Sequence, residues 1–320
     1  MLTYSVMLPF STTKPDQLVP YASMVEWTAV HRLWQGQSVV IEPHQGFAHA
    51  AGSGLRIPLG LAVTLMPLRH PFEAAVQAAS LARTTGQPLV AGYGPGPKLF
   101  QQMLRGKPYE SQLGAVREYV TAMRGLLSGK PVAQDGEYFT CHGSLGVANP
   151  LVEIGLGVLR PRMAELAGEV ADVAITWLTP ASYIRDTIRP ALEEGARKAG
   201  RPVPRIVAAV PMALERHGRE PAEVALASNA AHLRGPHYQD MLAKAGVDVA
   251  GKEPIEAAAA LVESGAFLSG DLDRLVAGLK EFEDAGVDEV ALNFTGVQNK
   301  SGPRKAMEEL RLVLKEVGVL

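Results

Sequence analysis

The pattern that most constrains the fold is an alternation of short apolar runs with longer amphipathic segments. Each run is nearly continuous in apolar residues, which is typical of parallel strands covered by helices on both faces. Repeated strand-to-helix alternation favours a (β/α)8 TIM barrel, with a doubly wound open sheet as the alternative. Strands are expected at residues 4–8, 38–41, 57–65, 89–93, 152–158, 172–177, 205–212 and 287–293. Helices are expected at residues 16–33, 71–85, 109–128, 161–170, 181–199 and 271–285.

The length of 320 residues is compatible with two average domains or with one α/β barrel. No low-complexity tract or linker divides the chain, so a single domain over residues 1–320 is expected. Two segments are longer than the strand–helix alternation of a barrel requires. Residues 94–110 are rich in Gly and Pro, and residues 215–268 hold extra Ala- and Glu-rich helical stretches. We expect both segments to be insertions into the barrel.

Composition excludes several classes of function. The 31 Lys and Arg residues nearly balance 33 Asp and Glu residues, which argues against nucleic acid as the main partner. The single cysteine, Cys141, cannot form an intramolecular disulfide and suits a reducing cytoplasm. The first ten residues lack the pattern of a signal peptide, and no apolar stretch is long enough to predict a membrane span. No His or carboxylate set has metal-ligand spacing, so no metal site is expected.

Two predicted strand ends have the composition of ligand-binding loops, and in such barrels chemistry lies at these ends. The run Gly155–Leu159 precedes a helix that begins near Pro161, where free N–H groups with Arg160 and Arg162 suit a phosphate. A tight turn with solvated arginines is the alternative explanation. Residues 92–96, Gly-Tyr-Gly-Pro-Gly, lack the third glycine of a dinucleotide fingerprint. We expect the backbone there to approach a flat ligand.

Acid–base groups are few at the predicted strand ends. His44, just after the second expected strand, and Tyr93, in the fourth, are the candidate catalytic residues. His70 is expected to bond to backbone at a helix start. Without a Gly-x-Ser-x-Gly elbow, nucleophilic hydrolysis has little support. A phosphate site with so few acid–base groups indicates that a cofactor performs the chemistry. Four further histidines are expected to be ordinary helix or surface residues: His31, His217, His232 and His237.

Several segments together resemble the bacterial luciferase-like oxidoreductases, which use FMN or the deazaflavin F420 on a (β/α)8 barrel. The likeness includes an Arg-His-Pro helix start after the third strand and a Gly-x-Gly-x-Gly fourth strand. The segments follow the family order over most of the chain. They are residues 59–71, 89–96, 129–139, 157–172 and 284–288.

The resemblance implies a set of cofactor-binding residues. The Ala62–Val63 bond would be a non-prolyl cis peptide that supports the cofactor ring. Backbone amides of Gly157 and Val158 would hold the phosphate, and the end of the sixth strand would line the pocket. The full set implied is Ala62, Val63, Thr64, Gly92, Tyr93, Gly94, Gly157, Val158, Arg160, Thr176, Trp177 and Leu178.

Departures from the family pattern bear on the reaction. Many F420-dependent members carry Trp-x-x-Asp-His after the second strand, whereas Gln35-Gly36-Gln37-Ser38 follows Trp34 here. Pro97-Lys98 stands where many members have an acid. These losses disfavour sugar-phosphate or alcohol dehydrogenation. They favour hydride transfer to an electron-poor C=C or C=N of a small organic or modified-peptide substrate, with water or Tyr93 as proton source.

The choice of cofactor depends on the loop after the fourth strand. Lys98, Arg105 and Lys107 could meet the acidic tail of F420, which FMN lacks, although such cations also occur in an ordinary solvated loop. An F420-dependent oxidoreductase is therefore expected. An FMN-dependent monooxygenase and a non-catalytic ligand-binding barrel are the alternatives. The sequence leaves the oligomeric state open, and relatives often pair, so the resemblance makes a homodimer one assembly to test.

Overall fold

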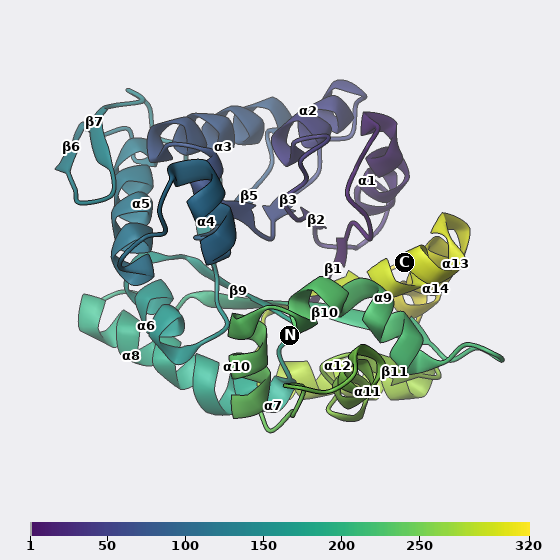
Figure 1. Ribbon diagram of the computed structural model, residues 1–320. Coiled ribbons are helices and arrows are strands. Elements are labelled where there is room, and N and C mark those ends of the chain that lie inside the picture. Colours follow the sequence, from purple (N-terminus) through teal and green to yellow (C-terminus); the bar gives the residue numbers. More distant parts are fainter. Residues whose placement is uncertain (1) are drawn as a thin grey trace.

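The computed structural model describes residues 2–320, and a closed barrel of parallel strands lies at its centre (Figure 1). Each barrel strand has a neighbour on both sides, since β12 pairs with β1 and β10 pairs with both β9 and β12. The (β/α)8 barrel is confirmed, and the doubly wound alternative is wrong because an open sheet would leave two edges unpaired. The barrel strands are β1 (Thr3–Met7), β2 (Leu33–Gln35), β3 (Leu59–Leu61), β5 (Leu89–Gly94), β8 (Val152–Gly157), β9 (Val173–Trp177), β10 (Arg205–Leu214) and β12 (Glu289–Asn293).

Helices surround the barrel, and two short strands extend it: β4 (Thr64–Leu65) pairs with β5, and β11 (Leu268–Gly270) pairs with β10. A separate hairpin joins β6 (Val132–Asp135) to β7 (Thr140–Gly143). Among residues 2–320, no helix is both long enough and apolar enough to cross a membrane. The helices up to the fifth strand and its following loop are η1 (Pro15–Leu18), α1 (Val19–Glu26), α2 (Pro43–Gly52), η2 (Met66–Leu68), α3 (Pro71–Thr85), α4 (Lys98–Arg105) and α5 (Gln112–Leu127). The later ones are α6 (Pro161–Val170), α7 (Ala181–Tyr183), the π-helix η3 (Ile184–Ile188), α8 (Arg189–Ala199), α9 (Pro221–Leu233), α10 (Pro236–Lys244), α11 (Pro254–Glu263), α12 (Leu272–Asp284), α13 (Thr295–Ser301) and α14 (Pro303–Glu316).

The second strand lies elsewhere than predicted. The run at 38–41 forms no strand, and its Val39 and Val40 are 83% and 61% exposed. Its β-branched residues imitate a strand, but the apolar residues that enter the barrel at this position are Leu33 and Trp34. The helix expected over 16–33 is accordingly too long, because α1 ends at Glu26. The other seven expected strands overlap observed ones.

Side-chain alternation along the strands separates an inner core from an outer core. The inner core fills the barrel and draws on nearly every strand, whereas the outer core lies between the strands and the helices. The largest member of the inner core is Trp34, which is fully buried. Gly60 makes room for its indole, because a Cβ on Gly60 would lie 2.2 Å from Cε3 of Trp34. The inner core consists of Met7, Trp34, Ala62, Val90, Val173, Ile175, Val207, Ala209 and Ala291.

A buried carboxylate joins the strands at the N-terminal end of the barrel. Oε1 of Glu289, the first residue of β12, accepts hydrogen bonds from Ser5 Oγ on β1 and Trp34 Nε1 on β2, each at 2.6 Å. Nε of Arg32 lies 3.5 Å from the same oxygen, and Nη1 of Arg205 on β10 lies 3.8 Å from Oε2. One side chain thus connects the strands on both sides of the closing β1–β12 pair.

The contact between Gly60 and Trp34 predicts a stability effect. Gly60→Ala should lower the free energy of unfolding by about 1–3 kcal/mol, because the methyl group would enter space that the fixed indole occupies. Gly52→Ala in α2 is the control, since no atom lies within 4 Å of its added Cβ. That control should be neutral or stabilising by up to about 1 kcal/mol. Urea unfolding of the two variants measures the difference, and equal midpoints would contradict the packing described here.

Candidate active site

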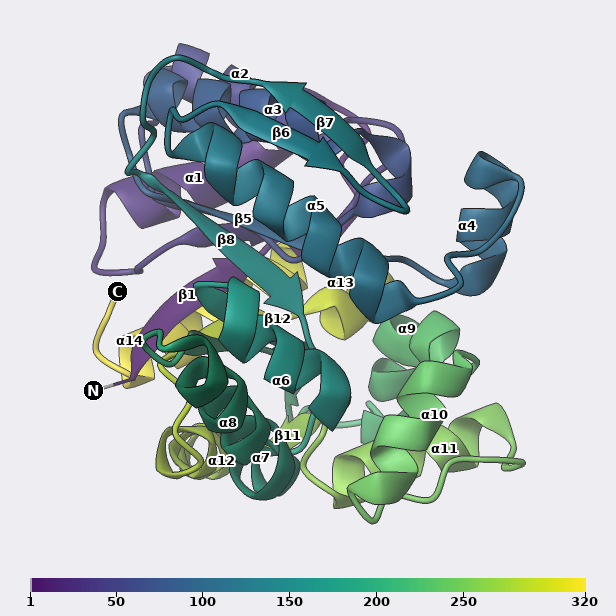
Figure 2. The ribbon, with the colours of Figure 1, turned by 90° about the vertical axis from the view of Figure 1, so that its left-hand side faces the viewer.

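All barrel strands end on the same side of the molecule, where α4, α9 and α10 also lie, while both termini lie on the opposite side (Figure 2). We call this end the barrel mouth. Among the predicted site residues, those with inward positions at the mouth are Ala62, Val63, Gly94, Gly157 and Trp177.

Val63 is the centre of the barrel mouth. It packs against the inner core, as does Trp177, and the peptide bond between Ala62 and Val63 is cis, as predicted. A Cβ added to Gly94 would lie 3.1 Å from Val63, and one added to Gly157 would lie 3.5 Å from it. Strands β5 and β8 therefore meet at one valine, and each contributes a glycine there. Because glycine has no side chain, the backbone at the buried Gly94 and at the half-buried Gly157 can come close to Val63.

Backbone N–H groups at the start of α6 form a candidate anion site beside the mouth. Within residues 2–320, the amides of Leu159, Arg160 and Arg162 have no hydrogen-bond acceptor. They lie at the positive end of a ten-residue helix, where a phosphate is favoured. We call these three groups the phosphate site. The predicted contribution of Val158 is wrong, because its N–H donates to Ile175 O at 2.8 Å and its side chain lies in the outer core.

Tyr93, predicted for both catalysis and cofactor binding, does not face the mouth. It lies between two inward-facing glycines of β5, so its side chain points into the outer core, where its ring packs 5.4 Å from that of Tyr119. Burial raises the pKa of its hydroxyl, which approaches only Ala74 O at 3.5 Å. Thr176, also predicted to bind the cofactor, does not face the mouth either. It is buried between Ile175 and Trp177 of β9, whose side chains point inward, so its own side chain points outward.

Three other predicted residues shape the backbone around the mouth. The Thr64 hydroxyl donates to Gly92 O at 3.0 Å and so joins β4 to β5. A Cβ on Gly92 of β5 would lie 2.0 Å from the carbonyl oxygen of Leu61 in β3, so only glycine permits β3 and β5 to approach this closely. Leu178 has a φ of 55°, unusual for a bulky residue, and its side chain is buried in the outer core. It turns the chain directly after Trp177 and fixes the end of β9.

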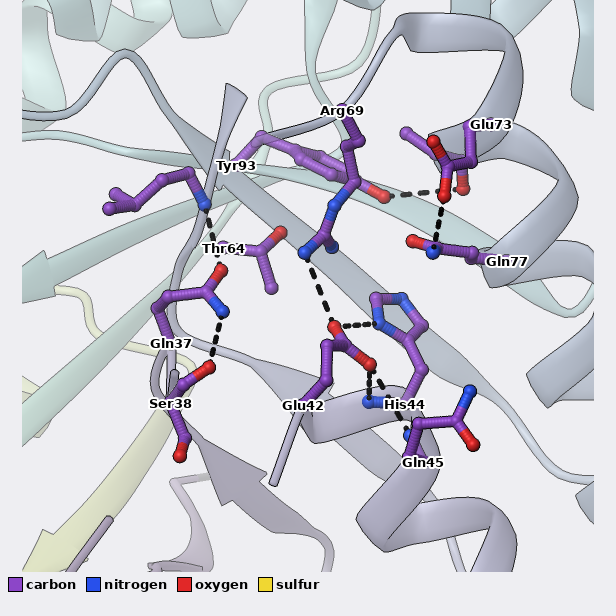
Figure 3. A network of polar contacts seen from close by, with 12 residues as sticks. Gln37, Ser38, Glu42, His44, Gln45, Thr64, Arg69, Glu73, Gln77 and Tyr93 are labelled. Atoms are coloured by element: carbon purple, nitrogen blue, oxygen red, sulfur yellow. Dashed lines mark hydrogen bonds and ion pairs between the residues drawn. The ribbon is translucent and has the colours of Figure 1, made fainter. Parts of the chain in front are cut away.

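His44, the other predicted catalytic residue, belongs to a network that caps α2 (Figure 3). The Glu42 carboxylate accepts a hydrogen bond from the backbone amide of His44, and it lies 2.7 Å from Nδ1 of the His44 ring. Arg69 donates to the same carboxylate at 3.3 Å. Burial alone would raise the pKa of Glu42, but the hydrogen bond from His44 and the two neighbouring positive charges outweigh it and lower that pKa. The network joins the start of α2 to the segment before α3 and engages Nδ1 of His44, whereas Nε2 of His44 is enclosed with no hydrogen-bond partner among residues 2–320.

His70 has the structural role expected of it: Nδ1 accepts the Phe72 amide at the start of α3, and Nε2 lies 2.9 Å from Thr140 O. Over residues 2–320, no group of three or more His, Cys, Asp or Glu residues is arranged to hold a metal ion.

The insertion after β10 adds residues to the mouth that the sequence did not indicate. His232 of α9 stacks on Trp177 with ring centroids 5.3 Å apart and planes tilted by 28°. Asp240 of α10 lies 3.7 Å from the Arg160 guanidinium, next to the phosphate site. No local motif could have indicated either contact, because each joins residues far apart in the sequence. Both place the insertion over one side of the mouth.

The placement of Tyr93 predicts a neutral substitution. Tyr93→Phe should leave ligand binding at the mouth unchanged within about twofold and alter the free energy of unfolding by no more than about 1 kcal/mol, since the lost hydrogen bond is long. Isothermal titration and urea unfolding measure the two quantities. A large loss of ligand affinity in this variant would show that the hydroxyl reaches the mouth.

Comparison with known proteins places these features in a family. The luciferase-like monooxygenase family matches residues 3–289. A 5,10-methylenetetrahydromethanopterin reductase of Methanolobus tindarius is 28% identical over 281 residues, which cover 82% of each chain.

Two solved structures share the barrel. The coenzyme F420-dependent tetrahydromethanopterin reductase from Methanopyrus kandleri superimposes with a TM-score of 0.71 at 21% identity, over 96% of this chain and 95% of that one. The oxygenating constituent of 3,6-diketocamphane monooxygenase from Pseudomonas putida, in complex with FMN, superimposes with a TM-score of 0.74 at 16% identity, over 99% and 97%. At these identities the structures establish the fold alone. The match over residues 3–289 establishes more: the chain belongs to the luciferase-like monooxygenase family.

Proposed function

We propose that the protein is an F420-dependent oxidoreductase that transfers a hydride between the reduced deazaflavin and a small organic or modified-peptide substrate. The observation that carries the proposal is the phosphate site, with three free N–H groups, beside Gly94 and Gly157, whose backbone lies close to Val63. This arrangement suits a flat ring attached to a phosphate-bearing chain. The relative from Methanopyrus kandleri, named as F420-dependent, favours the deazaflavin.

The chain's own residues would position the cofactor rather than react with it. Leu159, Arg160 and Arg162 would bind the phosphate through their amides. Gly94 and Gly157 would admit the ring, and Val63 would support one face of it. When bound, F420 supplies the hydride chemistry that no side chain of the mouth can perform. Reduction of an electron-poor C=C or C=N remains the favoured reaction, because it needs the least acid–base assistance from the protein.

The cations after β5 support the same cofactor. Lys98 and Lys107 are exposed at either end of α4, at the side of the molecule where the strands end. Arg105 lies over the Tyr109 ring, with its guanidinium carbon 3.7 Å from the centroid, so it is held in place. The acidic tail of F420 would meet these charges, whereas FMN has no such tail.

An FMN-dependent monooxygenase is the second candidate, favoured by the likeness to the FMN complex from Pseudomonas putida. The same phosphate site would serve FMN. In either case we treat residues 1–320 as one barrel domain that works in the cytoplasm, where the buried thiol of Cys141 would stay reduced, and we expect a homodimer.

Titration of the purified protein with F420 and with FMN tests the choice of cofactor. F420 should bind at least about tenfold more tightly, a difference of about 1.4 kcal/mol in binding free energy. Tight binding of FMN without measurable affinity for F420 would exclude the deazaflavin assignment. Oxygen consumption with reduced FMN would then support the monooxygenase.

A substitution at the mouth tests the position of the phosphate site. Gly157→Asp should weaken F420 binding by at least about tenfold, because a carboxylate and added bulk would lie beside Val63 and the expected phosphate. Gly52→Asp, which adds the same charge at an open position of α2, should leave affinity unchanged. Fluorescence titration of both variants makes the comparison. Equal affinities would show that the phosphate binds elsewhere.

A further inference from the structure

Several enclosed polar atoms of residues 2–320 lack hydrogen-bond partners, and two of them belong to the rings that stack at the barrel mouth. Nε1 of Trp177 and Nδ1 of His232 are each enclosed, and nothing in residues 2–320 bonds to either of them. Leaving an enclosed polar atom unpaired costs about 1–3 kcal/mol, so native proteins usually supply a partner. The stack lies beside the inner core, because Trp177 packs against that core, as Val63 does. A polar ligand atom at the mouth is the partner that this arrangement lacks.

The ring of His232 is held between β9 and α10 of the insertion. Its ring packs against Trp177 on one side and meets Tyr238 of α10 edge-on, with centroids 4.9 Å apart. The charged and titratable neighbours on α10 are His237, whose ring adjoins Tyr238, and Asp240, which pairs with Arg160. Burial, with a smaller contribution from the positive charge of a protonated His237, lowers the pKa of His232 to about 4. The imidazole is therefore neutral at pH 7 and offers one N–H donor and one lone pair.

A neutral imidazole can polarise a carbonyl group without carrying a charge into an apolar site. The N–H hydrogen bond strengthens as negative charge develops on the oxygen, and low dielectric surroundings increase the effect. Of the two residues predicted to handle protons, Tyr93 faces the outer core, and His44 binds Glu42 through Nδ1 at the start of α2, with its Nε2 enclosed and unpaired. His232 differs from His44 because its ring stacks on Trp177, which packs against the inner core.

We propose that His232 is a catalytic residue that hydrogen-bonds through Nδ1–H to the carbonyl oxygen of a substrate whose C=C is conjugated to that carbonyl. This inference rests on the proposed function and assigns its substrate class. Hydride from reduced F420 forms a C–H bond at the β-carbon, and the C=C electron pair moves to the carbonyl oxygen as an enolate. The enolate then gains one proton at the α-carbon from water. The substrate is reduced by two electrons, and F420 is left oxidised.

Three variants separate this role from a purely structural one. His232→Phe keeps a ring that can stack on Trp177 but removes both nitrogens. His232→Asn keeps an amide N–H near the position of Nδ1. His237→Phe changes a neighbouring histidine of α10 whose ring does not contact Trp177 in the stack described above. Reduced F420 with 2-cyclohexen-1-one, a neutral conjugated ketone, provides the reaction.

His232→Phe should lower kcat by at least about tenfold, whereas His232→Asn and His237→Phe should stay within about threefold of the unaltered protein. The dissociation constant for F420 should change less than about twofold in all three. A spectroscopic measurement is independent of turnover: the 13C signal of the carbonyl-labelled ketone, bound with oxidised F420, should move downfield in the unaltered protein and lose this shift in His232→Phe.

Unchanged kcat or an unchanged carbonyl shift in His232→Phe would overturn the role of His232. Failure of the unaltered protein to bind or reduce the ketone while it still binds F420 would overturn the substrate class and leave the proposed function standing. Absence of F420 binding would overturn both.

Discussion

The buried carboxylate of Glu289 is the interaction on which the barrel depends. Glu289 is fully enclosed, and its oxygens are approached by groups from β1, β2 and β10, so it joins strands that lie almost 290 residues apart in the chain. Breaking a buried ionic contact of this kind typically costs about 3–5 kcal/mol, because a charge is left without compensation. Since closure of the barrel brings the strand ends together, the geometry of the mouth follows from contacts made at the opposite end.

Closure also determines which residues face the site. Along β5 and β9 the side chains alternate, so Gly92, Gly94 and Trp177 face inward while Tyr93 and Thr176 face the helices. Many of the predicted site residues are consecutive in β5 and β9, and alternation places neighbours in these strands on opposite faces. The sequence of β5 indicates this for Tyr93, because a residue between two others in a strand points to the opposite face from both of them. The cis peptide at Ala62–Val63 and the free amides before α6 could be predicted because each depends on a short local segment.

Contacts between distant segments could not be predicted in this way. The second strand was missed because Val39 and Val40 have high strand propensity, yet only tertiary packing decides that Trp34 enters the barrel. The stack of His232 on Trp177 joins α9 to the end of β9, and nothing in either local sequence indicates the other. The sequence around His232 predicts an ordinary helix residue, because the feature that distinguishes it is its contact with Trp177 in a distant strand.

The distribution of charge through the barrel explains the chemistry that the mouth can support. Charged groups gather at the N-terminal end around Glu289, and the inner core between that end and the mouth is apolar apart from the Trp34 indole nitrogen that Glu289 engages. Close to the mouth, the Arg160 guanidinium is paired with Asp240, although both are partly exposed and the pair is weak. A phosphate bound at the start of α6 would compete with Asp240 for that arginine. Cofactor binding would then use the positive charge of Arg160, which is paired with Asp240 in the free protein. Val63, Trp177 and the neutral His232 place no fixed charge at the reacting centre. In such surroundings negative charge that develops on a substrate is poorly solvated, so a single well-placed N–H donor has more effect than it would in water.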